Sequence, residues 1–312
     1  KSNGHQTMTL VTGAKLLALA QKGHYAVGAF NVNNLEILQA IVSAAEAQKA
    51  PAILQTSEGA IQYAGLEQLH CLIANAARNS NMPFALHLDH GKDLKLIKKC
   101  IDIGYTSIMY DGSHLPLAEN IANTQKVVAW AEEKGVSVEA ELGTIGGAED
   151  NVSSRTIVYT DPAVAVQFVK ETKCDSLAIA IGTSHGAYKF NGAAKLDIGR
   201  LQVIREVVSV PLVLHGASSL PDWLIKKATD FGAKLGTAEG VPELQLQRAI
   251  HYGICKINTD TDLRLAFVTG MREYLHEHPD DIDPRRVLTA GKALLQQVVE
   301  HRMELFGSKG KA

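Results

Sequence analysis

The sequence predicts an α/β fold, a (β/α)8 TIM barrel with long loops after the fifth and sixth strands. Eight short apolar runs alternate along the chain with segments of helical periodicity. The runs are largely apolar throughout, as expected of parallel strands that helices cover on both faces. Polar residues capable of chemistry gather where the runs end, and this is the end at which such barrels carry their active sites.

The expected strands cover residues 26–32, 51–57, 83–89, 107–112, 136–142, 176–183, 211–216 and 254–259. Pro51, Pro83 and Pro211 mark three strand starts, where proline interrupts no ladder hydrogen bond. An open doubly wound sheet is the competing fold, but it usually carries a glycine-rich dinucleotide loop after its first strand. Here the first strand ends in Phe30-Asn31-Val32-Asn33, which favours the barrel.

Helix signals separate these strands. Apolar residues recur at helical spacing over 35–45, behind an asparagine cap at position 33 or 34. A second pattern runs from Leu94 to Ile101 and ends at Gly104. Asp161 and Pro162 supply the cap and first turn of a helix through Phe168. Further helices are expected over 196–207, in a stretch ending at residue 252, and over 284–306, the last packed on the barrel or on another subunit.

Two connections are long. Gly143–Thr160, after the fifth strand, has 18 residues and is rich in Gly, Ser and Asn, and Ser184–Ala194 follows the sixth strand. Long loops without secondary structure are uncommon in compact domains and tend to be lids, so we expect both loops to act in this way.

Composition limits the partners. Of the 312 residues, 46% are hydrophobic, so we expect a substantial core. The formal net charge is −2, so we expect no nucleic-acid partner. No apolar run approaches the roughly 20 residues that span a bilayer, so no membrane partner is expected. The four cysteines are far apart, as is typical of reduced cysteines in a cytoplasmic protein. We expect a single domain over residues 8–307, with residues 1–7 a tag or a disordered N-terminus.

Three histidines carry the chemistry. His90, His185 and His215 end the third, sixth and seventh strands, and each is followed by glycine. Three imidazoles that leave one position open are the outline of a catalytic zinc site, where a Lewis acid can polarise a carbonyl group. Histidines that only hydrogen-bond in the core are the alternative, and the repeated strand-end position disfavours it.

Carboxylates accompany these histidines. Asp89 directly precedes His90 and is not expected to share its geometry easily. Glu139 and Glu141 share one strand face by the period of two, so one of them can orient a ligand histidine or bind metal directly. On spacing alone, Glu149 in the long loop is better explained as a solvated acid.

The last two strands end in small polar residues, Gly216-Ala217-Ser218-Ser219 and Asn258-Thr259-Asp260-Thr261. Barrels commonly hold phosphate at this position, where exposed backbone N–H groups and helix N-termini favour an anion. Lys189, in the loop after the sixth strand, can add a positively charged side chain to such a phosphate site. The residues therefore indicate a zinc enzyme that acts on a phosphorylated carbonyl compound.

Nine segments, from the first strand to the last helix, resemble the class II, metal-dependent fructose-bisphosphate aldolases, a group that includes tagatose-bisphosphate aldolase. They are Phe30-Asn31, Gln55-Thr56-Ser57, HLDHG at 87–91, DGSHLP at 111–116, VEAELGTIGGAED at 138–150, GTSHGAYK at 182–189, LVLHGASS at 212–219, KINTDTDLR at 256–264 and DPRR at 283–286. The resemblance implies reversible zinc-dependent cleavage of fructose 1,6-bisphosphate, a step of glycolysis and gluconeogenesis, to dihydroxyacetone phosphate and glyceraldehyde 3-phosphate.

The resemblance also implies residue roles. His90, His185 and His215 are implied zinc ligands, and Glu141 an alternate or supporting metal ligand. Asp89 is implied as the acid/base at the substrate hydroxyl. Glu149 is implied as the group that exchanges a proton with the dihydroxyacetone phosphate carbon, and this role replaces its interpretation as a solvated acid. The implied substrate and phosphate contacts are Asn31, Ser57, Gly186, Lys189, Gly216, Ser218, Asn258, Asp260 and Thr261.

Two further features follow from the resemblance. Backbone carbonyls near Ser184, Gly186 and Gly216 are implied to hold a monovalent cation, Na⁺ or K⁺. Arg285 is implied to reach a phosphate in the neighbouring subunit, which predicts a homodimer or homotetramer.

Three alternatives stay open. Tagatose 1,6-bisphosphate differs from the fructose sugar only at C4. The segment Gly232–Gly253, which lengthens the connection before the last strand, and NTDTD at 258–262 look more like the fructose-bisphosphate enzymes and favour fructose. A zinc hydrolase on a barrel would usually carry His-x-His at the first strand, where Asn31-Val32-Asn33 stands instead. A metal-binding protein without catalysis is disfavoured by the full set of acids, ligands and phosphate residues. No lysine, Lys256 and Lys189 included, has a clear case as an imine former.

Overall fold

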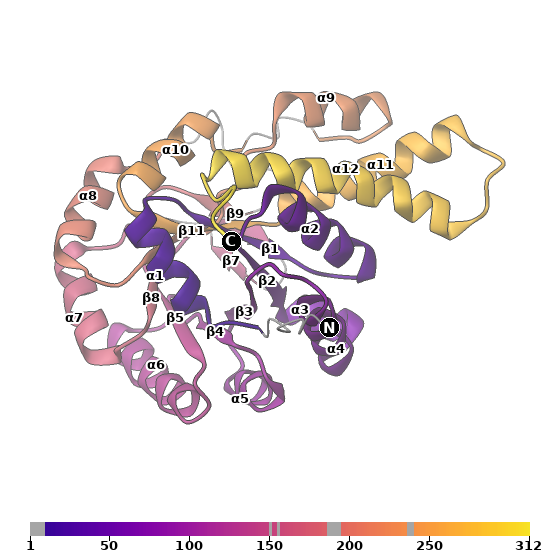
Figure 1. Cartoon of the computed structure of the whole chain (residues 1–312). Coiled ribbons are helices and arrows are strands. Elements are labelled where there is room, and N and C mark those ends of the chain that lie inside the picture. Colours follow the sequence, from indigo (N-terminus) through magenta and orange to yellow (C-terminus); the bar gives the residue numbers. More distant parts are fainter. Residues whose placement is uncertain (1–9, 150–151, 155–156, 186–194, 236–239) are drawn as a thin grey trace.

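Eight parallel strands close into a barrel in the order β1-β11-β10-β8-β5-β4-β3-β2, with helices around the outside (Figure 1). The structure, a computed structural model, describes residues 10–149, 152–154, 157–185, 195–235 and 240–312. The predicted (β/α)8 barrel is confirmed. The prediction for residues 1–7 lies outside the described residues.

Every barrel strand lies within or close to one of the predicted ranges, and Pro51, Pro83 and Pro211 immediately precede β2, β3 and β10. The strands are β1 Val27–Asn31, β2 Ala52–Ser57, β3 Phe84–Gly91, β4 Ser107–Tyr110, β5 Ser137–Leu142, β8 Ser176–Ile179, β10 Leu212–Leu214 and β11 Ile254–Thr259. The parallel register sets Ser57 beside Asp89, so the polar ends of neighbouring strands meet at one mouth.

The predicted helix boundaries are largely confirmed. The side chain of Asn34 accepts a hydrogen bond from the Ile37 backbone N–H, and Asp161 caps the helix that begins at Pro162. Gly104 ends its helix with a φ of 115°, a conformation that glycine adopts readily. The helices are α1 Gly13–Gly23, α2 Leu35–Gln48, α3 Glu58–Ala64, α4 Leu66–Arg78, α5 Leu94–Ile103, α6 Leu117–Glu132, α7 Pro162–Thr172, α8 Ile198–Val207, α9 Asp222–Asp230, α10 Glu243–His251, α11 Thr261–Glu277 and α12 Pro284–Leu305.

The connection after β5 is not the structureless loop that we expected. It forms β6 Gly146–Glu149 and β7 Val152–Ser154, which pair antiparallel, and β6 pairs parallel with β9 Ser184–His185. The two long connections are thus joined to each other by backbone hydrogen bonds. Pairing satisfies backbone groups that an isolated loop would leave to water, which is the physical reason for the difference.

The lower end of the barrel interior, at the N-terminal ends of the strands, is largely apolar, although Ser107 and Ser137 are buried there against α1. Helix α1 packs against β1, β3, β5 and β11 and buries Leu16, Leu17 and Ala20 there. These side chains form one buried cluster with a set of barrel residues, called here the lower layer: Val27, Ala29, Ile53, Ala85, Met109, Ala178 and Val213. The side chains of the lower layer therefore pack as core residues and are not candidates for catalysis or metal binding.

Helices α11 and α12 form a hairpin that projects beyond the barrel (Figure 1). The expected helix over 284–306 is confirmed, and α12 packs on α2 of the barrel. All four cysteines are free thiols, three of them buried. None of the helices in the described part of the chain has the length and apolar character that a membrane span requires.

Candidate active site

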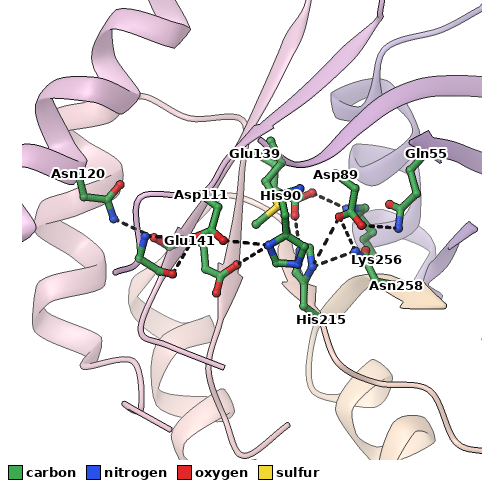
Figure 2. A network of polar contacts seen from close by, with 12 residues as sticks. Gln55, Asp89, His90, Asp111, Asn120, Glu139, Glu141, His215, Lys256 and Asn258 are labelled. Carbon is green, nitrogen blue, oxygen red and sulfur yellow. Dashed lines mark hydrogen bonds and ion pairs between the residues drawn. The ribbon is translucent and has the colours of Figure 1, made fainter. Parts of the chain in front are cut away.

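A second set of inward-facing side chains lies above the lower layer, toward the C-terminal ends of the strands, and all of its members are polar. Figure 2 shows most of them. We call it the upper layer: Asn31, Gln55, His87, Asp89, His90, Asp111, Glu139, Glu141, His215, Lys256 and Asn258. Each has at most 9% of its surface exposed, so every charge in this layer must be balanced inside the protein.

His90 has a backbone conformation that strands rarely contain. Its φ is +47°, and the register of β3 against β4 shifts between Leu88 and Gly91. The usual alternation would direct Asp89 and His90 to opposite faces of the strand. Instead, one side-chain atom from each lies within 4.8 Å of the other and of His215. Our expectation that Asp89 and His90 would not easily share one geometry was wrong, because the left-handed residue removes the alternation.

His215 is held at both ring nitrogens. Its Nε2 lies 2.6 Å from Glu139 Oε1, and its Nδ1 lies 2.9 Å from Asn258 Nδ2. An amide nitrogen can only donate, so Nδ1 accepts and Nε2–H donates to Glu139. The Nδ1 lone pair therefore accepts from Asn258, and Nδ1 lies 3.9 Å from Asp89 Oδ1. The ring centroids of His90 and His215 are 4.5 Å apart.

Glu139 and Glu141 both face the barrel interior, as their spacing predicts. Glu141 Oε2 and Asp111 Oδ2 lie 3.6 Å and 3.0 Å from His90 Nδ1. The described residues thus contain two groups that can hold a metal ion, one of Asp89, His90 and His215 and one of His90, Asp111 and Glu141. His185 lies on β9 at the same end of the barrel, and its side chain lies outside the described residues.

The electrostatics of this layer favour a bound cation. Burial, and then the negative charge of Asp111, raise the pKa of Glu141 well above its ordinary value. Burial alone would lower the pKa of His90, but Asp89, Asp111 and Glu141 outweigh it and raise the value to about 10. His90 in turn lowers the pKa of Asp111 despite the opposing effect of burial.

The upper layer holds four buried carboxylates, those of Asp89, Asp111, Glu139 and Glu141, against the ammonium group of Lys256 and the imidazolium form that the raised pKa of His90 favours. In addition, Glu141 Oε2 has no hydrogen-bond partner among the described residues. A divalent cation would neutralise this excess and supply that oxygen with a ligand bond, so the donor set fits a metal.

Asp89 is surrounded by amide donors. Asn258 Nδ2 donates to Oδ1 at 2.9 Å, and Asn31 Nδ2 and Gln55 Nε2 both lie 3.3 Å from Oδ2. Gln55 also donates to Asn31 Oδ1 at 2.6 Å, which fixes the two amides relative to each other. The carboxylate is therefore held in one orientation at the mouth by contacts from β1, β2 and β11.

The structure brings most of the other predicted contacts to this mouth. Ser57 ends β2 and caps α3, and Ser218 is buried after β10. Gly216 has a φ of +59°, and a Cβ there would lie 2.8 Å from the Ser184 backbone, so only glycine fits between the two loops. Asp260 precedes α11, which begins at Thr261, and pairs with Arg264 at 2.6 Å.

Other predicted residues are not brought together here. Gly186 and Lys189 lie outside the described residues, and so does the side chain of Glu149, whose backbone belongs to β6. Arg285 lies near the outer end of the α11–α12 hairpin, is 89% exposed, and pairs with Asp283 of its own chain at 2.8 Å. It is not part of the site formed by its own barrel.

Sequence reasoning did not give site roles to Asp111, Lys256 or Arg264. Asp111 follows the fourth strand directly, so its strand-end position was the available signal. Lys256 stands two residues before Asn258, and the period of two places both on the inner face of β11. No comparable local signal marks Arg264.

Comparison with known proteins agrees with the geometry. The family described as fructose-bisphosphate aldolase class-II matches residues 11–311. The fructose-bisphosphate aldolase of Helicobacter pylori (strain ATCC 700392 / 26695) is 45% identical over 97% of this chain and 99% of its own length. That of Thermus caldophilus is 45% identical over 97% of this chain and 100% of its own.

Solved structures show the same fold. The YdjI aldolase from Escherichia coli K12 aligns with a TM-score of 0.79 at 30% identity, covering 97% of this chain and 99% of its own. A putative fructose-1,6-biphosphate aldolase from Coccidioides immitis aligns with a TM-score of 0.81 at 33% identity, covering 96% of this chain and 97% of its own. The chain belongs to the class II fructose-bisphosphate aldolase family, a family of lyases.

Proposed function

We propose that this protein catalyses the reversible cleavage of D-fructose 1,6-bisphosphate to dihydroxyacetone phosphate and glyceraldehyde 3-phosphate, with zinc as its metal. The observation that carries the proposal is the convergence of Asp89, His90 and His215 at the barrel mouth, with side-chain atoms within 4.8 Å of one another. Imidazole ligands suit zinc, and the relatives from Helicobacter pylori and Thermus caldophilus are named fructose-bisphosphate aldolases.

His90, His185 and His215 would hold the zinc ion, and Glu141 with Asp111 would form an alternate position around His90. A zinc ion held there would supply a Lewis acid for the ketose oxygens and would stabilise negative charge that develops on cleavage. Two features support these assignments. Glu139 fixes the tautomer of His215 with a 2.6 Å hydrogen bond, and Asp111 accepts from His90 at 3.0 Å.

Asp89 takes the proton from the C4 hydroxyl group in the cleavage direction and returns it in synthesis. Asn31, Gln55 and Asn258 hold its two oxygens from three strands. A base held in one orientation at hydrogen-bond distance from its proton can contribute about 10²–10⁴-fold to a rate. Lys256 does not compete as an imine former, because its ammonium group pairs with Glu139 at 2.7 Å below the mouth.

The remaining roles follow from the family resemblance. Glu149 exchanges a proton at the dihydroxyacetone phosphate carbon, Asn258 faces the cleaved ketose and Asp260 a substrate hydroxyl. The phosphate groups lie against Ser57, Gly186, Lys189, Gly216, Ser218 and Thr261, with a monovalent cation, Na⁺ or K⁺, near Gly216. The close approach of Gly216 to the Ser184 backbone supports this, because it brings two loops with small residues together.

We also propose a cytoplasmic homodimer or homotetramer with one barrel domain over residues 8–307. The free cysteines suit a reducing compartment. Arg285 supports the oligomer, because it is exposed on a projecting hairpin from which it can reach a neighbouring subunit.

The experiment compares cleavage of fructose 1,6-bisphosphate and tagatose 1,6-bisphosphate by the same preparation, with EDTA and with zinc added back. We expect cleavage of the fructose sugar with the larger kcat/KM, its loss in EDTA and its return with zinc. Cleavage that EDTA leaves unchanged would contradict the metal site, and a larger kcat/KM for tagatose 1,6-bisphosphate would reassign the substrate.

A further inference from the structure

Lys256 is a buried ammonium group with no direct place in the mechanism above. It is 0% exposed, on β11, two residues before Asn258 on the same inner face. Its Nζ donates to Glu139 Oε2 at 2.7 Å and lies 3.4 Å from His87 Nε2. Figure 2 shows it on the side of the network where Asp89 and Asn258 lie.

The other ring nitrogen of His87, Nδ1, contacts Ser107 and so fixes the orientation of the imidazole ring beside Lys256. His87 Nδ1 lies 2.7 Å from Ser107 Oγ, and the imidazole is 1% exposed. With Nδ1 protonated and donating to Ser107, Nε2 is an acceptor that faces the ammonium group. The Lys256 ammonium group is thereby held between an imidazole nitrogen and a carboxylate, at one point of the barrel interior.

The two carboxylate oxygens of Glu139 contact different groups, the ammonium group of Lys256 and the imidazole ring of His215. Oε2 accepts from Lys256 at 2.7 Å, and Oε1 accepts from His215 Nε2 at 2.6 Å. Ordered contacts therefore run from Ser107 through His87, Lys256 and Glu139 to His215. The far nitrogen of His215 is the one that faces Asp89 and Asn258.

We propose that Lys256 is a positioning residue for the metal site: it holds Glu139 as the acceptor that keeps the Nδ1 lone pair of His215 directed at the ligand group. The proposal rests on the function proposed above. A carboxylate that orients a ligand histidine commonly changes metal affinity by about 10–100-fold when it is removed. Here the carboxylate itself is buried and needs a counter-charge, which Lys256 supplies.

A purely structural ion pair is the competing explanation. Buried ion pairs are weak sources of stability, since apolar residues of similar size often do as well or better. The two explanations differ in what they predict for metal binding. A structural pair affects unfolding, whereas a positioning residue affects metal affinity through Glu139 alone.

The test measures the dissociation constant of Zn²⁺ for metal-free protein by chelator competition, in wild type, Lys256→Met, Glu139→Gln and the double variant. We expect each single variant to bind Zn²⁺ about 10–100-fold more weakly. The double variant should bind like Glu139→Gln within twofold, because Lys256 acts only through Glu139. The absorption spectrum of the Co²⁺-loaded protein should change in the same three variants.

Lys98→Met is the matched control, because Lys98 makes an exposed ion pair with Asp102 at 2.7 Å on the outer helix α5 and is not part of the upper layer. It should leave both the Zn²⁺ affinity and the Co²⁺ spectrum unchanged. Circular dichroism and thermal unfolding establish folding, and the double variant removes both buried charges together, so it is the variant expected to fold if Lys256→Met does not.

Zn²⁺ binding by Lys256→Met within twofold of wild type would overturn the proposal. So would a double variant whose loss of affinity is the product of the two single losses, or, if Lys256→Met does not fold, a double variant that binds Zn²⁺ more weakly than Glu139→Gln by tenfold or more. Absence of Zn²⁺ binding by the wild-type protein would overturn the proposed function as well, whereas equal binding by wild type and Lys256→Met overturns only the role of Lys256.

Discussion

The lower and upper layers of the barrel interior share strands β1, β2 and β3 and differ in what they bury. On β3, Ala85 belongs to the lower layer, and His87 and Asp89, two and four residues later, belong to the upper one. On β2, Ile53 is followed in the same way by Gln55. Two positions further along the same inner face, the strand thus changes from apolar core residues to polar residues of the candidate site. The lower layer should set stability and the upper layer activity.

The largest expected effect is at the mouth. Asp89→Asn keeps the size of the side chain and removes its basicity, so kcat/KM for fructose 1,6-bisphosphate should fall by about 10²–10⁴-fold. Zinc content, measured by atomic absorption, should stay at the wild-type value. Asp230→Asn, at an acid that is 53% exposed and paired with Lys226, is the matched control and should keep full activity. A loss of less than tenfold for Asp89→Asn would remove Asp89 from the proton transfer.

The lower layer should respond in the opposite sense. Ile53 is 1% exposed, so Ile53→Ala leaves a cavity and should lower the free energy of unfolding by about 2–5 kcal/mol. Urea unfolding measures this change, and kcat of the folded enzyme should stay within twofold. Val203→Ala, at a residue that is 47% exposed, should change stability by less than about 0.5 kcal/mol. A large fall in kcat for Ile53→Ala would break the division between the layers.

Part of this division is readable in the sequence. The strand ranges, the proline starts and the inner face shared by Glu139 and Glu141 follow from apolar runs and the period of two. The shared position of Asp89 and His90 does not, because it depends on the φ of +47° at His90, which no residue pattern announces. A left-handed residue at a strand end is a backbone feature that tertiary contacts impose.

The contacts between residues of the upper layer also could not be predicted from the sequence, because they depend on how the strands are arranged in the barrel. Lys256 and Glu139 are separated by 117 residues, and they meet only because β5 and β11 face each other across the barrel. The pairing of β6 with β7 was missed for a different reason. The segments GGAE and VSS are short and poor in apolar residues, so they look like loop until β9 offers them a partner.

The smallest expected effect concerns His87, at the boundary between the layers. Burial, and then Lys256, lower the pKa of His87 well below its ordinary value. The unfolded chain therefore binds a proton below about pH 6.5 that the folded protein does not, and stability is lost as pH falls through that value. Between pH 7 and 5.5, metal-free wild type should lose about 1.2 kcal/mol more than His87→Gln in urea unfolding. Equal losses would show that His87 is protonated in the folded protein.

The central claim is that the upper layer is a metal site built for carbon–carbon cleavage. Its most direct test is a titration of metal-free protein with Zn²⁺, with cleavage of fructose 1,6-bisphosphate followed at each addition. We predict activity that rises in proportion to bound zinc and reaches its plateau at one zinc ion per chain. Full activity in protein that contains no metal, or zinc that binds at the histidines without restoring cleavage, would contradict the claim.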